Sequence, residues 1–117
     1  MPTFAPGQIV IVGWRDALRR EANKRRPAVV IEDCELFDPS YPNVILVPLT
    51  EDVSLAIAEL AVRIEPAPEN GCTKTCFAVS PLVTGTSKAR VRGTASHITR
   101  QQLADIRLRE AEAIGLG

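Results

Sequence analysis

Short apolar runs, separated by polar stretches, constrain the fold of this chain more than any other feature. The clearest runs lie at 8–12, 28–32 and 44–48, and the longest apolar runs are four or five residues. β-Branched residues in runs of this length, bounded by Gly, Pro and charged residues, are typical of strands. The run 44–48 is apolar at consecutive positions, so we expect this strand to be buried on both faces.

The middle of the chain predicts further short strands. Residues 61–65 alternate apolar and polar side chains, which indicates a half-exposed strand, and residues 75–79 read as the next strand. Val83 and residues 87–92 suggest one more strand, interrupted by a flexible Thr84-Gly-Thr86 segment. Residues 52–59 fit either a short helix or an irregular excursion. The total is five or six strands.

The end of the chain carries the clearest local signal. Thr99 and Gln102 form a capping-box pattern, and Ile98 and Leu103 occupy the positions of a hydrophobic staple around it. A helix is predicted from Arg100 to about Ile114, followed by Gly115, with an apolar side made of Leu103, Ile106 and Ile114. Short strands followed by one helix predict a mainly β fold, a small antiparallel barrel with a C-terminal helix, as a single domain over 1–117.

The charges balance overall but are segregated along the sequence. The chain has 117 residues with 14 Lys+Arg and 14 Asp+Glu. Most of the bases lie in two segments, 15–26 and 88–100, whereas acids dominate residues 32–70. A net charge of zero excludes a uniformly basic nucleic-acid-binding surface but permits a local one. Solvated loops with scattered charge are the alternative interpretation.

The lack of a recognisable targeting signal and the pattern of cysteines favour a cytoplasmic protein. Residues 1–7 do not resemble a signal peptide, and the apolar runs are too short to cross a bilayer. Cys34, Cys72 and Cys76 are an odd number without a disulfide framework, and one histidine is too few for a convincing zinc site. We interpret them as reduced structural thiols. A redox pair of Cys72 and Cys76 is the alternative.

Few residue types offer catalytic chemistry. His97 is the single histidine, and there is no nucleophile motif, phosphate-binding glycine loop or evident carboxylate pair. Arg26 and Thr50 remain, each at the end of a predicted strand. A guanidinium there can bind a phosphate through two donors, and a hydroxyl can bind the same anion. Alternatively, Arg26 caps a turn and Thr50 starts a helix.

Three motifs in order resemble the MazF/PemK toxin family. They are Gly7-Gln-Ile-Val-Ile-Val12, Arg25-Arg-Pro-Ala-Val-Val-Ile31 and Val44-Ile-Leu-Val-Pro-Leu-Thr50, and the resemblance continues through 75–79, 87–90 and the closing helix. Membership implies an SH3-like barrel, a homodimer and a small cognate antitoxin as partner. It also implies a sequence-specific endoribonuclease that cleaves single-stranded mRNA without metal or cofactor.

The resemblance also implies roles for individual residues. Arg26 matches the catalytic arginine of the family and Thr50 its active-site threonine. The implied reaction is attack of an RNA 2′-OH on its own phosphate, giving a 2′,3′-cyclic phosphate. The expected RNA-binding residues are Trp14, by stacking on a base, and Arg19, Arg20, Lys24, Arg25 and Ser80. Some members carry an acid/base pair where this chain has Ala78 and Ser80, so the acceptor of the 2′-OH proton is left open.

Two other functions fit the same sequence. One is a family member with weak or no catalysis that serves as an RNA- or protein-binding module. The other is an SH3-like interaction domain whose groove binds a peptide. RNA cleavage that depends on Arg26 would separate the enzyme from both of them.

Overall fold

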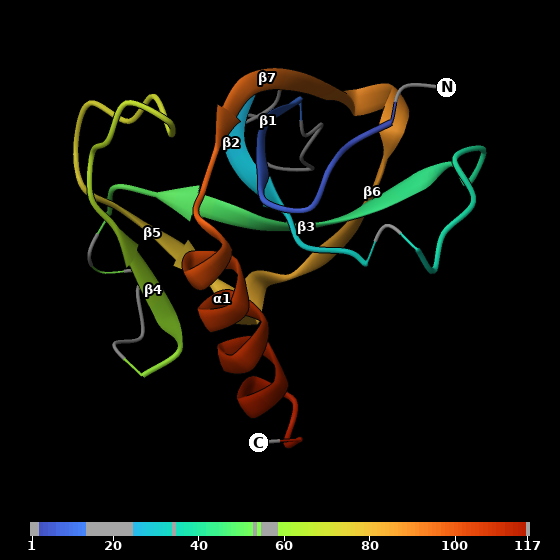
Figure 1. Ribbon diagram of the computed structural model, residues 1–117. Helices are drawn as coiled ribbons and strands as arrows, with labels where there is room; N and C mark the ends of the chain where they lie inside the picture. The colour runs from blue at the N-terminus through green and yellow to red at the C-terminus, as the bar shows by residue number, and fades with distance from the viewer. Residues whose placement is uncertain (1–2, 14–24, 34, 53, 55–58, 117) are drawn as a thin grey trace.

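A curved antiparallel sheet with one helix packed below it makes up the fold (Figure 1). The computed structural model describes residues 3–13, 25–33, 35–52, 54 and 59–116. These residues form seven strands: β1 (Gln8–Gly13), β2 (Arg25–Val30), β3 (Asn43–Thr50), β4 (Ala61–Ile64), β5 (Cys76–Val79), β6 (Thr84–Ser87) and β7 (Val91–His97). The 3₁₀ helices η2 (Ser80–Leu82) and η3 (Lys88–Arg90) flank β6, and α1 (Arg100–Ala113) follows β7.

The strand β3 occupies the centre of the sheet. The strand order is β4-β5-β3-β2-β1-β7, and β6 also pairs with β3. One half of β3 pairs with β6 and the other with β5, so this eight-residue strand connects both parts of the sheet. The sheet curls so that β1, β2 and β7 close the upper part of the molecule (Figure 1). The predicted mainly β, barrel-like fold with a C-terminal helix is confirmed.

Two buried clusters lie on opposite faces of the central strands. One contains Val10, Val12, Ala28, Val30, Val44, Leu46 and Val91. The other contains alternate residues of the same strands, together with β4, β5 and α1: Ile9, Val29, Ile31, Val47, Leu49, Val62, Ile64, Cys76, Ala78, Ile98 and Ile106. Because neighbouring residues of a strand point to opposite faces, a strand buried on both sides must be apolar throughout. The expectation for 44–48 is therefore confirmed.

The helix α1 begins as the sequence predicts. Thr99 Oγ1 accepts a hydrogen bond from Gln102 N (3.0 Å), and Gln102 Oε1 accepts one from Thr99 N (2.9 Å). Ile98 is buried, and Leu103 packs against the same cluster, which completes the staple. Ile114 was expected on the apolar side, but its side chain is 63% exposed because α1 ends at Ala113. Among the described residues, no helix is both long and apolar enough to span a membrane.

The strand limits differ from the prediction in two places. The second strand starts at Arg25 rather than Ala28, because residues 25–27 pair with β1. The predicted strand over 87–92 is wrong: Thr84–Ser87 is itself the strand β6, η3 follows it, and β7 runs from Val91 to His97. Thr84-Gly-Thr86 is ordered by its pairing with β3, which a sequence pattern of flexible residues does not reveal. Most of the uncertain 52–59 segment lies outside the described residues.

Candidate active site

Arg26 and Thr50 lie where two neighbouring strands, β2 and β3, separate. In the described part of the chain, the ladder between β2 and β3 starts at Ala28 opposite Pro48. If the same register is extended by two residues along both strands, Arg26 lies opposite Thr50. Pro27 lies between these positions and has no N–H to donate, which favours the opening of the ladder here.

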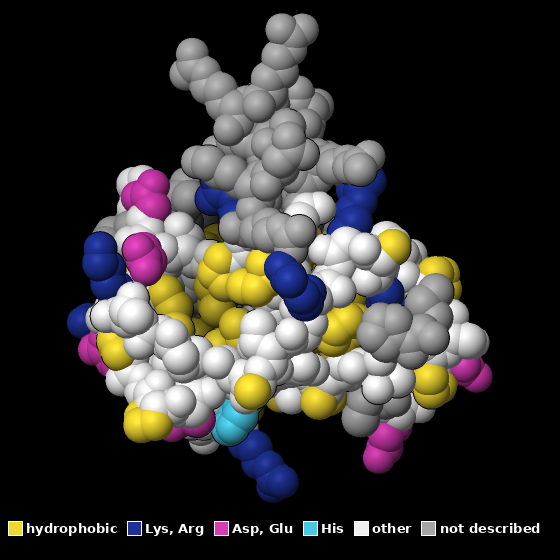
Figure 2. Space-filling model, turned by 90° about the horizontal axis from the view of Figure 1, so that it is seen from above, with side chains coloured by type: hydrophobic (Ala, Val, Ile, Leu, Met, Phe, Trp, Pro, Cys, Tyr) yellow, Lys and Arg dark blue, Asp and Glu magenta, His cyan; other side chains and the backbone are white. Residues whose placement is uncertain are grey.

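A pocket opens at this separation and contains both residues. It has a volume of about 630 Å³. Its lining combines apolar side chains from the strands with polar groups from their ends and from the segment before β5: Ile9, Ile11, Arg26, Pro27, Leu49, Thr50, Glu51, Asp52, Asn70, Gly71, Cys72, Thr73, Lys74, Cys76, Thr94 and Ser96. Figure 2 shows a hollow with a hydrophobic floor on the upper face, with basic side chains at its rim. An apolar floor combined with polar groups that can orient a ligand is typical of a binding site.

The hydroxyl of Thr50 is oriented by the chain that follows it. Thr50 Oγ1 accepts a hydrogen bond from Asp52 N at 3.0 Å. A hydroxyl has one proton to donate, so this bond leaves that proton available for a ligand in the pocket. Asp52 in turn accepts bonds from Ser54 Oγ (2.7 Å) and Ser54 N (2.9 Å). These bonds hold the pKa of the Asp52 carboxyl below its ordinary value.

The opposite wall of the pocket is a turn organised by Asn70. This buried side chain accepts hydrogen bonds from Ala67 N (3.1 Å) and Cys72 N (2.9 Å) and donates one to Glu65 O (2.9 Å). Gly71 follows with a φ of +66°, in the left-handed region that favours glycine. The turn brings Lys74 to the pocket, a second cation besides Arg26 in the described lining.

Sequence reasoning did not find Asn70 and Lys74 as site residues. The Asn-Gly pair at 70–71 predicts a turn, but nothing in it shows that the turn faces β2 and β3. That placement depends on the pairing of β5 with β3, which sets Phe77 opposite Thr50. Long-range strand pairing is not readable from a local pattern.

Two cysteine thiols lie in this wall. Cys72 Sγ and Cys76 Sγ are 3.7 Å apart, and both residues line the pocket. Cys72 is half-buried, whereas Cys76 is the first residue of β5 and is buried. Burial, together with the hydrogen bond between Cys76 and Cys72 and the nearby Cys72 and Glu51 side chains, raises the pKa of the Cys76 thiol to about 12.

Several predicted RNA-binding residues cannot be located in the structure. Trp14, Arg19, Arg20 and Lys24 lie outside the described residues. The backbone of Arg25 pairs with Gly13 in the β1–β2 ladder, but its side chain also lies outside what the structure describes. The expected roles of these residues therefore stay predictions.

Ser80 does not contribute to the pocket. Its side chain is completely buried at the start of η2, and its hydroxyl donates a hydrogen bond to Ile106 O in α1 at 3.4 Å. A hydroxyl buried beneath a helix cannot reach RNA on the surface. The expected RNA-binding role of Ser80 is therefore wrong for this structure.

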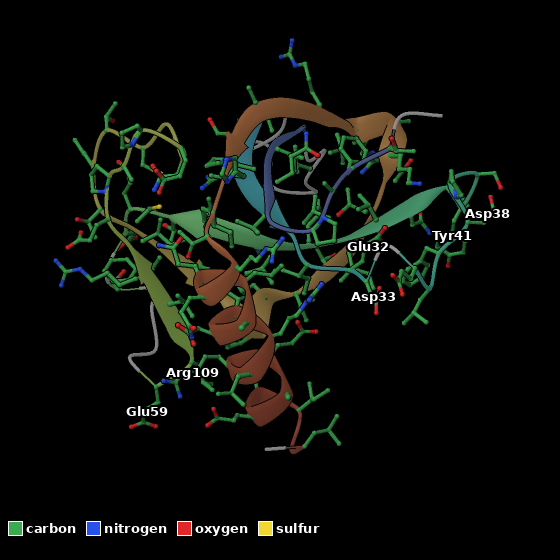
Figure 3. The ribbon with its side chains drawn as sticks, in the orientation of Figure 1. Glu32, Asp33, Asp38, Tyr41, Glu59 and Arg109 are labelled. Carbon is green, nitrogen blue, oxygen red and sulfur yellow. The ribbon has the colours of Figure 1, made fainter. Side chains whose placement is uncertain are left out.

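The basic residues of the second basic segment, 88–100, differ in burial. Lys88 is 5% exposed, and its Nζ donates a hydrogen bond to Pro39 O at 3.2 Å, so it holds the loop before β3. Arg92, in contrast, is exposed on β7. Of the acids, Asp33 and Asp38 lie at one side of the molecule and Glu59 at the other, away from its upper face (Figure 3). The acidic middle of the sequence is thus spread over several surfaces.

The remaining candidates for chemistry do not meet at this pocket. His97 is exposed at the end of β7, its Nδ1 lies 3.2 Å from Ile98 O, and it is not among the residues that line the pocket with Arg26. No group of three or more His, Cys, Asp or Glu side chains that could hold a metal ion occurs within the described ranges. Arg26 and Thr50 are the predicted catalytic residues that the fold brings together.

Comparison with solved structures identifies the fold. The fold is similar to that of the Mycobacterium tuberculosis toxin MazF-mt6, with a TM-score of 0.72 and 17% identity over 94% of this chain and 98% of that one. It is also similar to MazF from Deinococcus radiodurans, with a TM-score of 0.71 and 17% identity over 94% of each chain. An endoribonuclease in complex with its cognate antitoxin from a mycobacterial species matches over 98% of both chains, with a TM-score of 0.68 and 15% identity. The protein therefore has the fold of MazF toxins.

A match to a protein-family model shows the family to which the chain belongs. The model of the PemK-like, MazF-like toxins of type II toxin–antitoxin systems matches residues 5–112. The chain belongs to this family, and the resemblance of its three motifs to the MazF/PemK toxins is confirmed. Comparison with curated proteins gives no match.

Proposed function

We propose that this toxin is a sequence-specific, metal-independent endoribonuclease that cleaves single-stranded mRNA, and that Arg26 and Thr50 are its catalytic residues. The observation that supports this most directly is the shared pocket of these two side chains. They are 24 residues apart in the sequence (26 to 50) and reach one pocket through the pairing of β2 with β3. The family supports the same activity.

For the proposed cleavage reaction, the site must bind a phosphate and stabilise the negative charge that develops on it in the transition state. The 2′-oxygen of a ribose attacks the adjacent phosphorus, and the bond to the 5′-oxygen of the next nucleotide breaks. The products are a 2′,3′-cyclic phosphate and a 5′-OH end. The Arg26 guanidinium stabilises the charge on the phosphoryl oxygens, and the free proton of the Thr50 hydroxyl fixes one of them. Lys74 supplies a further positive charge at the rim.

The pocket also restricts which group takes the 2′-OH proton. Its described lining contains two carboxylates, Glu51 and Asp52. Hydrogen bonds from Ser54 hold the pKa of Asp52 below its ordinary value. We propose that one of these two carboxylates, which directly follow Thr50 in the sequence, accepts the proton.

The family and its solved relatives support a proposal about the partners. One similar structure is an endoribonuclease with its cognate antitoxin, and another contains MazE and MazF from Deinococcus radiodurans. We propose that this chain likewise forms a single-domain, cytoplasmic homodimer that a small cognate antitoxin inhibits. Basic side chains of the 15–26 segment would hold the RNA backbone on either side of the cleaved bond.

Mapping of RNA 5′ ends after induced expression tests the proposal. Wild-type protein should arrest growth and generate new 5′-OH ends, whereas Arg26→Ala should lower cleavage by at least about a hundredfold, because the main charge on the phosphate is lost. Arg109→Ala is the control, since Arg109 is on α1 and pairs with Glu112. It should cleave as the wild type does.

The alternatives give different results in the same experiment. RNA binding without new 5′ ends would identify a binding module without catalysis. Neither binding nor cleavage would favour a peptide-binding domain. Equal cleavage by wild type and Arg26→Ala would contradict the catalytic role of Arg26.

A further inference from the structure

A pair of thiols in the pocket wall has no role in the proposed cleavage reaction. Cys72 Sγ and Cys76 Sγ are 3.7 Å apart, and both residues line the same pocket as Arg26 and Thr50. A disulfide requires a sulfur separation of about 2.05 Å, so the two sulfurs must approach by about 1.7 Å. Such an approach needs a backbone that can adjust on at least one side.

The segment around Cys72 meets that condition. Residues 72–75 belong to neither a helix nor a strand, and Gly71 precedes them at a φ of +66°. Cys76, in contrast, is fixed at the start of β5, where it packs into the core. Closure of the pair therefore means movement of Cys72 toward a stationary Cys76.

We propose that Cys72 and Cys76 are a modification site: they form a reversible intramolecular disulfide that reshapes the pocket wall and suppresses RNA cleavage. The effect on cleavage rests on the proposed function, whereas formation of the bond does not. The thiols face each other directly, and one of them is accessible from the pocket.

The reaction is thiol–disulfide exchange with a low-molecular-weight disulfide as oxidant. The thiolate of the half-buried Cys72 attacks one sulfur of the oxidant, forms a mixed disulfide and releases the first small thiol. Cys76 Sγ then attacks Cys72 Sγ, and the second small thiol leaves with the proton of Cys76. The protein loses two hydrogen atoms, and the oxidant is reduced to two thiols. A reducing thiol in excess reverses both steps.

Bond formation would alter the site through the turn that carries Cys72. Cys72 N donates to Asn70 Oδ1 at 2.9 Å, so displacement of Cys72 pulls on the side chain that organises the turn. Gly71, Thr73 and Lys74 belong to the same wall of the pocket. A shift of about 1 Å in positioning groups can reduce catalysis by up to a hundredfold, and we expect a loss on the order of tenfold.

Peptide mapping of the Cys34→Ser protein tests bond formation. This variant leaves Cys72 and Cys76 as the thiols of the chain. After incubation with glutathione disulfide, the protein mass should fall by two hydrogen atoms. Trypsin cuts after Lys74, so the peptides 64–74 and 75–88 should remain joined until dithiothreitol is added. Cys72→Ser in the same background should give no joined peptides, and Cys76→Ala provides a second control. A stable glutathione adduct without joined peptides would overturn the proposal.

Two readouts then test the effect on the pocket. Amide resonances of Thr50 and of residues 70–76 should shift on oxidation, and RNA cleavage should fall by about tenfold and recover with dithiothreitol. The Cys72→Ser variant should show no oxidant response. Unchanged Thr50 resonances and cleavage in the disulfide form would overturn the regulatory role. If the reduced protein does not cleave RNA, the proposed function fails, while the joined peptides and the resonances still decide on the disulfide.

Discussion

The hydroxyl of Thr50 has both a structural and a proposed chemical role. It accepts a hydrogen bond from Asp52 N, which fixes the chain where it leaves β3, and its own proton remains to donate into the pocket. Two substitutions of Thr50 test this hydroxyl. Serine keeps both the acceptor and the donor, whereas valine has the shape of threonine but neither function.

We predict that Thr50→Ser retains RNA cleavage within a few-fold of wild type and that Thr50→Val loses about a hundredfold, because one donor to the phosphate disappears. Single-turnover cleavage of an RNA substrate measures the effect. Thermal unfolding of both variants is the control for loss of the Asp52 contact. Equal cleavage by the serine and valine variants would show that the hydroxyl is not used.

Single residues also show where sequence reasoning succeeds. Arg26 and Thr50 are recognisable because one lies near the start of its motif and the other closes its motif, each at a strand end, where a polar side chain has access to solvent. Ser80 was an expected RNA-binding residue and Lys88 belongs to the second basic segment, yet both are buried and bond to backbone carbonyls of Ile106 and Pro39. Burial of a polar group depends on partners distant in the sequence, 26 residues away for Ser80 and 49 for Lys88, so a local pattern cannot reveal it.

At the scale of elements, the turn between β4 and β5 determines one wall of the candidate site. Gly71 adopts a φ of +66°, and a Cβ at this position would lie 2.7 Å from Ser96 Oγ in β7. Gly85 in β6 provides a matched comparison, because a Cβ there would meet nothing within 4 Å.

We predict that Gly71→Ala lowers the free energy of unfolding by about 1–2 kcal/mol, the cost of a left-handed conformation for a residue with a side chain. Denaturant unfolding monitored by circular dichroism measures this. Gly85→Ala should stay much closer to wild type because its backbone is not in the left-handed region and space is open around it. The same loss of stability in both variants would mean that the turn conformation is not the cause.

The β6–η3–β7 segment was the least predictable part of the fold. Thr84-Gly-Thr86 has no apolar pattern, and its buried residue is the polar Thr86. Its ordered conformation comes from the ladder with β3. Strands β1 to β5 were predictable to within a few residues, since buried strands carry runs or alternation of apolar side chains. The capping box similarly fixed the start of α1 from local residues alone.

At the scale of the whole molecule, the balanced charge conceals where the individual cations lie. Arg26 and Lys74 line the pocket together with the carboxylates of Glu51 and Asp52, while Asp33, Asp38 and Glu59 lie on other surfaces (Figure 3). Nucleic-acid affinity depends on the cations that touch phosphates and not on the net charge.

We therefore predict that Lys74→Gln reduces the slope of log affinity against log salt by about one unit for a non-cleavable RNA, as expected for the loss of one phosphate contact. Arg109→Gln removes the same charge from α1 and should leave the slope unchanged. The Arg19, Arg20 and Lys24 triple substitution should flatten the slope further. Identical slopes for Lys74→Gln and Arg109→Gln would place the RNA elsewhere. Fluorescence anisotropy at several salt concentrations supplies the data.

The central strand β3 has a consequence for how the molecule opens. It is packed on both faces and pairs with β2, β5 and β6, so neither buried cluster can come apart without exposing the other. Amide protons of Leu46 and Val47 should accordingly exchange with solvent only through complete unfolding. The turn at 69–75 is tied down mainly by Asn70 and should exchange through small local openings. The pocket is therefore lined both by β3, whose amide protons should exchange slowest, and by the turn at 69–75, whose amide protons should exchange much faster.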